Sequence, residues 1–385
     1  MLTCQKHLFS LPDDIHYLNC GYMSPLARRV EAAGLAGMAR KRDPSTITPA
    51  MFFDESNTAR QLFAELINAE AERIALIPAA SYGIAMVARN LKIARGQNLV
   101  VMHEQFPSNI YTWKRLAQET GAALRTVQPP EGPNRGARWS EHFIDAIDAD
   151  TVLVTLGTVH WADGTRFDLD AIGRRAREVG AAFVIDGTQS VGAMPFDVQR
   201  LQPDALICAA YKWLLGPYST GVAYLGPRFD NGVPLEENWI GRLGSEHFGG
   251  LVNYQEAYQP GALRYDVGER SNFILVPMLI AGLELVLEWG QAPIQAYCEA
   301  LTRDLLQEAQ ALGFVLEDEA WRSAHLFGVR VPEHLSVDQL RDALAQRNVA
   351  ASVRGDAIRI SPHVYNDTAD IDALRDALHA VVSLV

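Results

Sequence analysis

Two segments, AFVIDGTQS (182–190) and ALICAAYKWLLGP (205–217), decide the predicted fold. Each begins with a short apolar run, which is typical of a fully buried strand. The first run ends on Asp186 and the second leads into Tyr211 and Lys212. Lysine is rarely fully buried without a partner, so Lys212 either extends to the surface or has its amine used in a site.

The chain around these segments alternates strand-like and helix-like patterns. Strands are expected at 73–77, 98–102, 123–127, 151–156, 182–185, 204–209 and 221–225, and helices at 80–90, 108–120 and 169–179. This alternation predicts an α/β fold with a mostly parallel sheet covered by helices on both faces. Such sheets bind ligands at the carboxyl ends of their strands.

The second half of the chain changes character. Residues 227–270 are rich in Gly, Pro, Asn and Glu and are expected to form long loops, and 272–311 to form two helices. Strands at 314–317, 325–331 and 358–361 with helices at 337–346 and 369–383 predict a smaller α+β domain. We therefore expect a large domain over 21–255 and a small domain built from 1–20 and 256–385.

Composition limits the classes of partner. The 385 residues are 48% hydrophobic with a net charge of −12 and no block of Lys or Arg, so nucleic acid and membrane are not expected as partners. The four cysteines lie far apart, which predicts free thiols and no metal site. The N-terminus lacks a signal-peptide core, and no apolar run reaches membrane-spanning length. A cytoplasmic protein with a small-molecule substrate is expected.

Asp186 and Lys212 together point to one cofactor. Pyridoxal 5′-phosphate forms a Schiff base with a lysine, and its pyridinium nitrogen needs a carboxylate partner. Taken alone, Asp186 is equally suited to a helix cap or a Mg²⁺ ligand. A donor near Asp186 would bond the phenolic oxygen of the cofactor, and Gln189 fits this role.

The phosphate of such a cofactor needs hydrogen-bond donors. The segment IPAASYG (77–83) runs from a predicted strand into a predicted helix. The backbone N–H groups of Ala80 and Ser81, with the Ser81 hydroxyl, would form an anion site at the helix N-terminus. The alternative is that Ser81 simply caps the helix.

These motifs resemble those of the class V aminotransferase family of fold-type I enzymes, which depend on pyridoxal phosphate. The group holds cysteine desulfurases, selenocysteine lyases, kynureninase and isopenicillin N epimerase-like proteins. The most specific matches are VIDGTQSVGAMPFDV (184–198) and AAYKWLLGPYSTG (209–221), and the resemblance extends from YLNCGYMSPL (17–26) to IRISPHVYN (358–366). It implies a homodimer with its active site at the interface, in which Lys212 is the Schiff-base lysine, Asp186 the pyridinium partner and Gln189 the donor to the phenolic oxygen.

The resemblance also implies further cofactor contacts. Phe106 stands where the family places a ring-stacking residue, and Thr158 where desulfurases carry an Asn near the phenolic oxygen. Tyr211 matches a kynureninase tyrosine that serves the phosphate. Trp239 and Asn272 resemble kynureninase positions that reach a phosphate across the dimer, although core packing suits Trp239 equally well. His160, close to Thr158, is expected to be a surface or structural histidine.

An amino-acid substrate presents a carboxylate, which the planar fork of arginine suits. Arg354 and Arg359 align with family arginines near the substrate, and strand alternation would turn Arg359 away from Ile358 and Ile360. Asn19 and Tyr22 are proposed to line the substrate entrance.

The type of reaction remains open among transamination, elimination and epimerisation, with an aminotransferase-like enzyme as the first expectation. A desulfurase needs a cysteine on a mobile late loop, whereas Cys298 lies in an amphipathic helical stretch, so persulfide chemistry of that kind is not expected. A C–S or C–Se lyase remains an alternative. More remote alternatives are a phosphate-binding α/β protein without this cofactor and a regulator that binds it without turnover.

Overall fold

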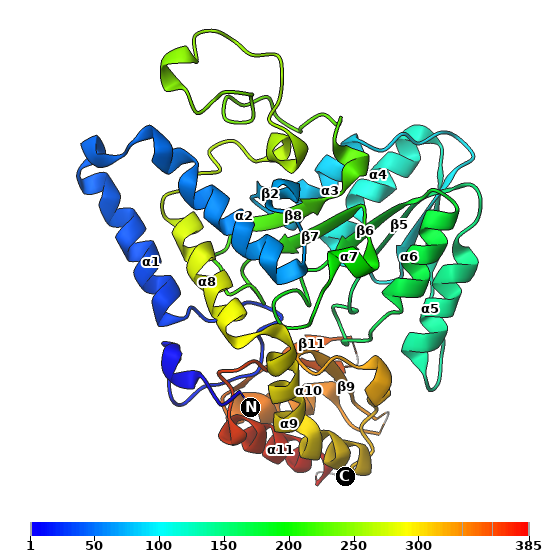
Figure 1. The fold of residues 1–385 in the computed structure, drawn as a ribbon. Coiled ribbons are helices and arrows are strands. Elements are labelled where there is room, and N and C mark those ends of the chain that lie inside the picture. The colour runs from blue at the N-terminus through cyan, green and yellow to red at the C-terminus, as the bar shows by residue number, and fades with distance from the viewer. Residues whose placement is uncertain (1, 333, 356, 384–385) are drawn as a thin grey trace.

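A seven-stranded sheet forms the centre of the larger part of the molecule (Figure 1). The computed structural model describes residues 2–332, 334–355 and 357–383. The strand order is β2 (Ile74–Ile77), β8 (Gly221–Leu225), β7 (Ala205–Ala209), β6 (Ala182–Asp186), β5 (Thr151–Gly157), β3 (Asn98–Met102) and β4 (Ala123–Val127). Pairings from β7 to β4 are parallel, and β8 is antiparallel to both of its neighbours. The prediction of a mostly parallel α/β sheet is confirmed.

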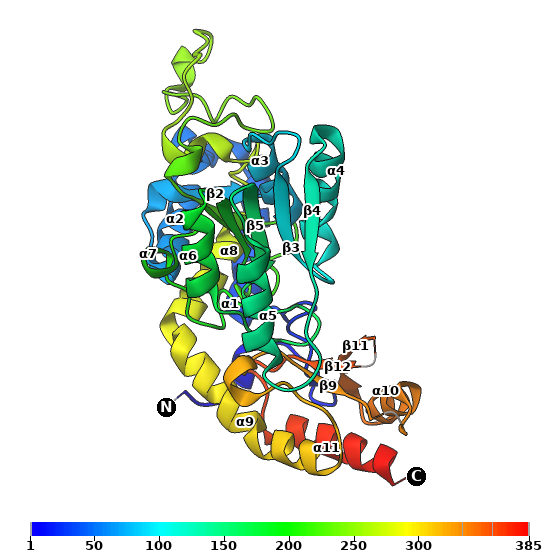
Figure 2. The same cartoon turned by 90° about the vertical axis from the view of Figure 1, so that its right-hand side faces the viewer.

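Strand residues alternate between two helical layers, which Figure 2 shows on either side of the sheet. On β2, Ala75 and Ile77 pack with α3 (Ala80–Arg89) and α4 (Tyr111–Thr120). Ile74 and Leu76 point the other way, into a second core. That core includes apolar side chains from α2 (Asp54–Ile67), α5 (Arg135–Ala146), α6 (Leu169–Glu178) and α8 (Leu275–Trp289). Because both faces are covered, β2, β7 and β8 are apolar and buried along their whole length, whereas the edge strand β4 is largely exposed.

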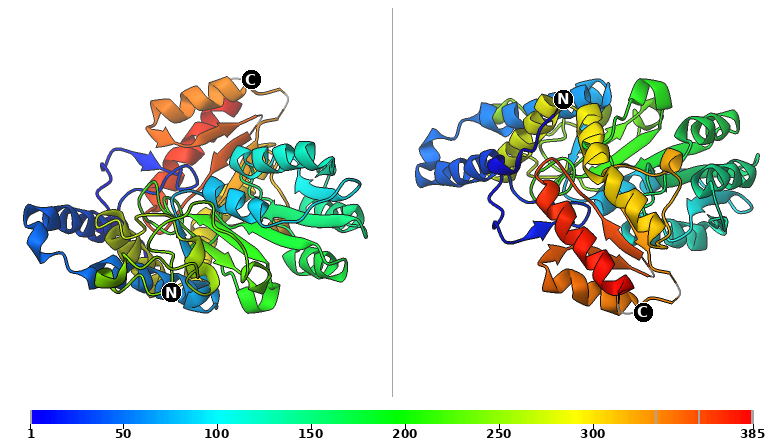
Figure 3. Two further views of the ribbon diagram at one scale, coloured as in Figure 1. Left: turned by 90° about the horizontal axis from the view of Figure 1, so that it is seen from above. Right: turned by 90° about the horizontal axis from the view of Figure 1, so that it is seen from below.

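The small domain holds a three-stranded antiparallel sheet. Its order is β11 (Ser352–Arg354), β12 (Ala357–Ile360) and β9 (Phe327–Arg330). This sheet shares a core with α9 (Gln291–Ala311), α10 (Val337–Gln346) and α11 (Thr368–Val382). The N-terminal strand β1 (His16–Tyr17) pairs with β10 (Val349–Ala350), so the segment around β1 runs beside the small domain, as both views of Figure 3 show.

The domain boundary at 255/256 remains a prediction. Helix α8 falls on the small-domain side of that boundary, yet it packs against α1 (Arg28–Ala39) and α2. Residues 227–270 form loops with only short 3₁₀ turns, as predicted, and part of this segment projects at the top of Figure 1.

The predicted strand at 314–317 is wrong. Only Val315 pairs, through an isolated bridge to Arg330, because Glu317 turns to accept a hydrogen bond from Thr165 in the large domain. Among the described residues, no single helix has both the length and the apolar composition needed to cross a membrane; α8 and α9 reach them only as a pair bent by 71°.

Candidate active site

The carboxyl ends of β5, β6 and β7 meet at one edge of the sheet. Gly157 pairs with Asp186, which in turn pairs with Ile207, so the ends of the three strands lie side by side. A cavity of about 240 Å³ opens there. The predicted site residues among its lining are Ala80, Ser81, Phe106, Asp186, Gln189, Tyr211 and Lys212.

Lys212 lines the cavity with a side chain that is only 5% exposed. Its Nζ lies 5.6 Å from the centre of the Phe106 ring and 5.5 Å from that of Tyr211. In the described part of the chain, no group accepts a hydrogen bond from Nζ. Burial, reinforced by the positive charge of Arg359, lowers the pKa of Lys212 to about 7. The amine is therefore partly neutral and nucleophilic near neutral pH.

Asp186 lies at the end of β6 and lines the same cavity. Burial raises the pKa of its carboxyl, whereas hydrogen bonds from Thr188 and the charge of Lys212 lower it. The backbone N–H of Thr188 donates to Oδ1 at 3.0 Å. A half-buried carboxyl of this kind is suited to a positively charged ligand atom, which would replace the lost solvation.

Gln189 follows in the turn after β6 and is 6% exposed. Its Nε2 donates to the carbonyl of Gly21 at 3.0 Å, and its Oε1 accepts from the Trp213 indole at 3.1 Å. The turn after β6 is thereby tied to the N-terminal loop and to the residue that follows Lys212.

Helix α3 begins at Ala80 on the cavity wall. The residue before it, Ala79, has no side-chain acceptor, so the first N–H groups of the helix receive no cap. Tyr82 and Gly83 donate to the Ala79 carbonyl, which leaves the N–H groups of Ala80 and Ser81 for an anion or solvent. Ser81 lies inside the helix, so the alternative that it caps this helix is wrong.

Phe106 and Tyr211 form the aromatic walls. The Phe106 ring packs edge-on against Trp161, at 5.5 Å between centroids, and Tyr211 contacts Tyr218 at 4.7 Å. Both rings line the cavity that also holds Lys212 and Asp186.

Arg354 and Arg359 both contact Trp161, which lines the cavity. Arg359 is 1% exposed, and its Nη1 donates to the Trp161 carbonyl at 2.9 Å. The Arg354 guanidinium lies 5.3 Å from the centre of the Trp161 ring. Burial and the charge of Arg354 lower the pKa of Arg359 to about 10, so it remains a cation at neutral pH. Ile358 and Ile360 point into the small-domain core instead, as alternation requires.

The N-terminal loop adjoins the site without lining the cavity. Ser24 donates its N–H to the Tyr211 carbonyl at 3.0 Å, while Tyr22 is 58% exposed. Asn19 is buried and accepts a hydrogen bond from Ser352.

Three other predicted residues lie away from the cavity of this chain. Thr158 donates to Ser190, although its neighbours Gly157 and Val159 line the cavity. Trp239 packs in an aromatic group with Phe52, Phe53 and Phe248, and Asn272 caps the start of α8 by accepting from the N–H groups of Ile274 and Leu275.

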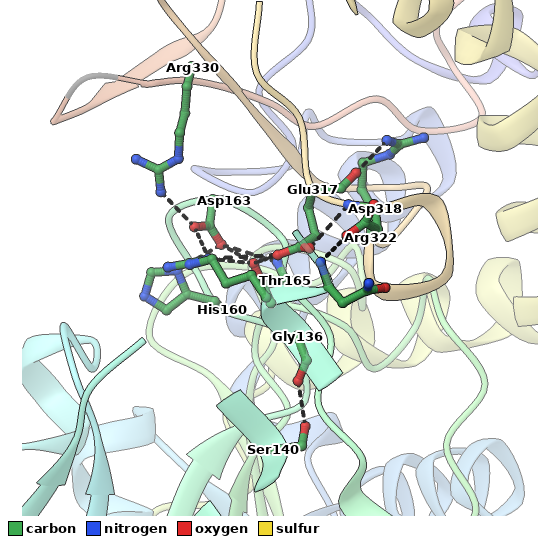
Figure 4. Close-up of polar contacts among 11 residues, drawn as sticks. Gly136, Ser140, His160, Asp163, Thr165, Glu317, Asp318, Arg322 and Arg330 are labelled. Atoms are coloured by element: carbon green, nitrogen blue, oxygen red, sulfur yellow. Dashed lines mark hydrogen bonds and ion pairs between the residues drawn. The ribbon is translucent and has the colours of Figure 1, made fainter. Parts of the chain in front are cut away.

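His160 belongs to a polar network beside the site (Figure 4). Its Nδ1 lies 2.9 Å from Asp163 Oδ1, and Asp163 also binds Arg135 of α5 and Arg330 of β9. Burial would raise the pKa of Asp163, but His160 and Arg135 hold it below its usual range. The contact to Asp163 supports the expected structural role of His160.

Sequence reasoning missed several lining residues. Trp161, Thr188 and the segment Tyr218–Thr220 all line the cavity. The polar tripeptide YST (218–220), placed after an apolar run and before a strand, was a usable signal for the last of these. Trp161 gave no signal, because its position depends on a turn held by Asp163.

These groups fit pyridoxal phosphate. The cavity offers a buried amine with no hydrogen-bond partner among the described residues for the aldehyde, a half-buried carboxyl for the ring nitrogen and the uncapped start of a helix for the phosphate. An aromatic wall is available for the ring face.

Known proteins share both the sequence pattern and the fold. Residues 46–374 match the family model described as aminotransferase class-V. An uncharacterized aminotransferase of Bacillus subtilis is 26% identical over 85% of this chain and 84% of its own. The isopenicillin N epimerase of Streptomyces clavuligerus is 26% identical over 84% and 83%. The apo structure of a cysteine desulfurase from Thermococcus onnurineus superposes with a TM-score of 0.83 at 19% identity, covering all of both chains.

Proposed function

The chain belongs to the class V aminotransferase family of pyridoxal-phosphate-dependent enzymes, and from this premise we propose that it transforms a small L-amino acid at its α-carbon through Lys212. The observation that carries the proposal is that a buried amine, with no hydrogen-bond partner among the described residues, and a half-buried carboxyl lie at neighbouring strand ends. Few other enzyme functions require a lysine amine and a carboxyl together in one cavity.

When bound, pyridoxal phosphate withdraws electrons from the α-carbon of an amino acid, which makes the α-proton removable. Lys212 would hold the cofactor aldehyde through its amine and, once released by the substrate amine, take the α-proton as general base. Asp186 would keep the ring nitrogen protonated. Gln189 would donate to the phenolic oxygen, and Phe106 would cover the ring face.

The phosphate would bind the N–H groups of Ala80 and Ser81, with Tyr211 beside it. Arg359 would bind the substrate carboxylate, assisted by Arg354. Within the described part of the chain, the Arg359 Nε has no hydrogen-bond partner, which leaves a donor for a ligand. Asn19 and Tyr22 would border the entrance from the N-terminal loop, and Thr158 would act by supporting the turn rather than by touching the ring.

We further propose a homodimer, in which Trp239 and Asn272 of one protomer approach the phosphate of the other. The exposed Trp239 side chain and the projecting loop around it are suited to such an interface. A cytoplasmic location is proposed because all four cysteines are free thiols, as in a reducing compartment.

The chemistry after proton removal is proposed to be aminotransferase-like, with a C–S or C–Se lyase as the second candidate. Cys298 is buried, and its thiol donates a hydrogen bond to the Pro362 carbonyl. Burial raises the pKa of this thiol. None of the described residues that line the cavity is a cysteine. A lyase of this chain would therefore release its sulfur or selenium without placing it on a protein thiol.

Borohydride reduction and peptide mass spectrometry test the central assignment. Protein incubated with pyridoxal phosphate and then reduced should carry the added mass on Lys212 alone. Lys212→Ala should carry none, whereas the control Lys92→Ala, at an exposed lysine, should label like the wild type. A label on other lysines only, or an unchanged label in Lys212→Ala, would refute the proposal.

A panel of L-amino acids without a keto acid then separates the two reactions. An aminotransferase yields one equivalent of keto acid per site and stops. A lyase that eliminates the β-substituent continues to turn over and, with uptake of water, releases sulfide or selenide, ammonia and the keto acid.

A further inference from the structure

The Trp213 indole makes a contact that the proposed chemistry leaves unexplained. Trp213 follows Lys212, is fully buried, and donates from Nε1 to Gln189 Oε1 at 3.1 Å. An indole N–H only donates, and an amide presents an acceptor on one side and a donor on the other. The indole therefore requires the oxygen of the Gln189 amide to face it.

A second contact imposes the same orientation from the opposite side. Gln189 Nε2 lies 3.0 Å from the carbonyl of Gly21, which only accepts. A flipped amide would place oxygen against oxygen at Gly21 and N–H against N–H at Trp213. The orientation of Gln189 is therefore fixed twice, by groups from two segments far apart in the sequence.

The backbone of Gln189 is held as firmly. His325 Nε2 lies 2.8 Å from the Gln189 carbonyl, and His325 Nδ1 lies 2.8 Å from Gln295 Nε2. Because a carbonyl only accepts, Nε2 carries the proton and Nδ1 accepts from Gln295. His325 also packs perpendicular to the Trp213 ring, with centroids 4.5 Å apart. Gln189 thus has little freedom to move or rotate.

One hydrogen of the Gln189 amide remains unused. The NH₂ group has two, and the Gly21 carbonyl takes one. No second acceptor lies within reach among the described residues, and Gln189 lines the cavity. The free N–H is therefore available to a ligand atom, and an anionic oxygen is the acceptor that it would bind most strongly.

We propose that Trp213 is a positioning residue, whose indole N–H keeps the Gln189 NH₂ group, rather than its C=O, turned to the anionic ring oxygen of the cofactor. The inference rests on the proposed function, because it assigns Gln189 a partner on pyridoxal phosphate. It adds that Trp213, the residue after Lys212, decides whether this oxygen faces the NH₂ group or the C=O group of Gln189.

The test measures the pH at which the visible absorbance of the cofactor-loaded protein changes, without substrate. A donor to the ring oxygen favours its deprotonated form, so removing the donor raises this midpoint. Trp213→Phe keeps an aromatic ring and loses the N–H, and an upward shift of about one pH unit is expected. Trp213→His keeps a ring N–H at the matching position and should restore most of the wild-type midpoint.

Trp113→Phe is the matched control. Trp113 is also fully buried and donates its indole N–H to an amide oxygen, that of Asn109, at 2.9 Å, but it does not line the cavity. Its midpoint should equal that of the wild type.

A double-mutant comparison separates positioning from general destabilisation. Gln189→Leu should raise the midpoint at least as much as Trp213→Phe, and the double variant should match Gln189→Leu, because Trp213 acts through Gln189. Additive shifts, or an unshifted Trp213→Phe, would overturn the proposal. If Trp213→Phe does not fold, a Gln189→Leu variant whose absorbance midpoint equals that of the wild type overturns the proposal alone. A wild type that gains no visible band refutes the proposed function itself.

Discussion

The amine of Lys212 owes its chemistry to its surroundings. It lies in a cavity between the aromatic rings of Phe106 and Tyr211, with no hydrogen-bond partner among the described residues. Burial and the charge of Arg359 destabilise its protonated form more than Asp186 stabilises it, so the pKa falls to about 7. This loss of solvation gives the site a usable base, and it has a cost in stability.

That cost predicts a pH dependence for the cofactor-free protein. Between the folded pKa of about 7 and the ordinary value of 10.5, the unfolded chain holds a proton on Lys212 that the folded chain has lost. Stability should therefore rise with pH across this window, by about 1.4 kcal/mol per pH unit from this group, and level off below pH 7. Urea unfolding of wild type and Lys212→Met at pH 7 and pH 9 measures the difference. Identical pH slopes in the two proteins would contradict it.

Arg359 should act on substrate binding more than on cofactor binding. Replacing it with alanine removes a charge-assisted bond of roughly 1.5–3 kcal/mol, so KM should rise by one to two decades. The borohydride label on Lys212 should persist, because Arg359 does not line the cavity. Arg303→Ala, at an exposed helical ion pair, is the control. An unchanged KM in Arg359→Ala would contradict the proposal that Arg359 binds the substrate carboxylate.

At the scale of elements, α8 supports the loop that carries Lys212. Gly282 on α8 faces the backbone of Leu214 and Leu215, and a Cβ at this position would lie 2.5 Å from the Leu214 carbonyl oxygen. The helix can approach the loop this closely only because residue 282 has no side chain. Leu215 itself lies in the left-handed region at φ 54°, so packing holds this backbone in an unfavourable conformation.

Gly282→Ala should therefore destabilise the fold although alanine is the better helix former. The clash is with backbone and cannot be relieved by a side-chain rotation, so a loss of about 1–3 kcal/mol is expected. Gly249→Ala, where a Cβ meets nothing within 4 Å and φ is not positive, should change stability little. Thermal unfolding of the two variants measures the difference. Equal melting temperatures would contradict the prediction and show that α8 moves to accommodate the Cβ.

The sequence predicted elements where the pattern was local and missed what depends on tertiary contact. Strand ends at Asp186 and before Lys212 followed from apolar runs that stop at a polar residue. Helices α1, α2 and α5 were not predicted, and in α5 the buried pair Trp139 and Phe143 is preceded by a Pro- and Gly-rich stretch. Trp161 was missed because its place is set by contacts between the domains.

At the scale of the whole molecule, the two domains meet on the turn at residues 160–166. The Asp163 carboxylate binds Arg135 of the large domain at 2.8 Å and Arg330 of the small domain at 3.1 Å. The Gly328 N–H of β9 donates to the Asp163 carbonyl at 2.9 Å. The same turn presents the Trp161 carbonyl to Arg359. The turn that joins the domains, whose contact with Arg330 Figure 4 shows, therefore also contacts the arginine that we propose to bind the substrate carboxylate.

Asp163→Ala should accordingly weaken both the contact between the domains and the binding of substrate. Asp163→Ala removes a buried carboxylate that pairs with Arg135 and Arg330, so a loss of about 3 kcal/mol is expected, near the lower end of the known range because Arg330 is partly exposed. KM should rise severalfold as Trp161 loosens, whereas the borohydride label on Lys212 should persist, because Asp163 does not line the cavity. Asp170→Ala breaks an exposed pair with Arg200 and should cost under about 1 kcal/mol with KM unchanged. If Asp163→Ala unfolds like Asp170→Ala and keeps the wild-type KM, the turn does not couple the domains to the arginine site.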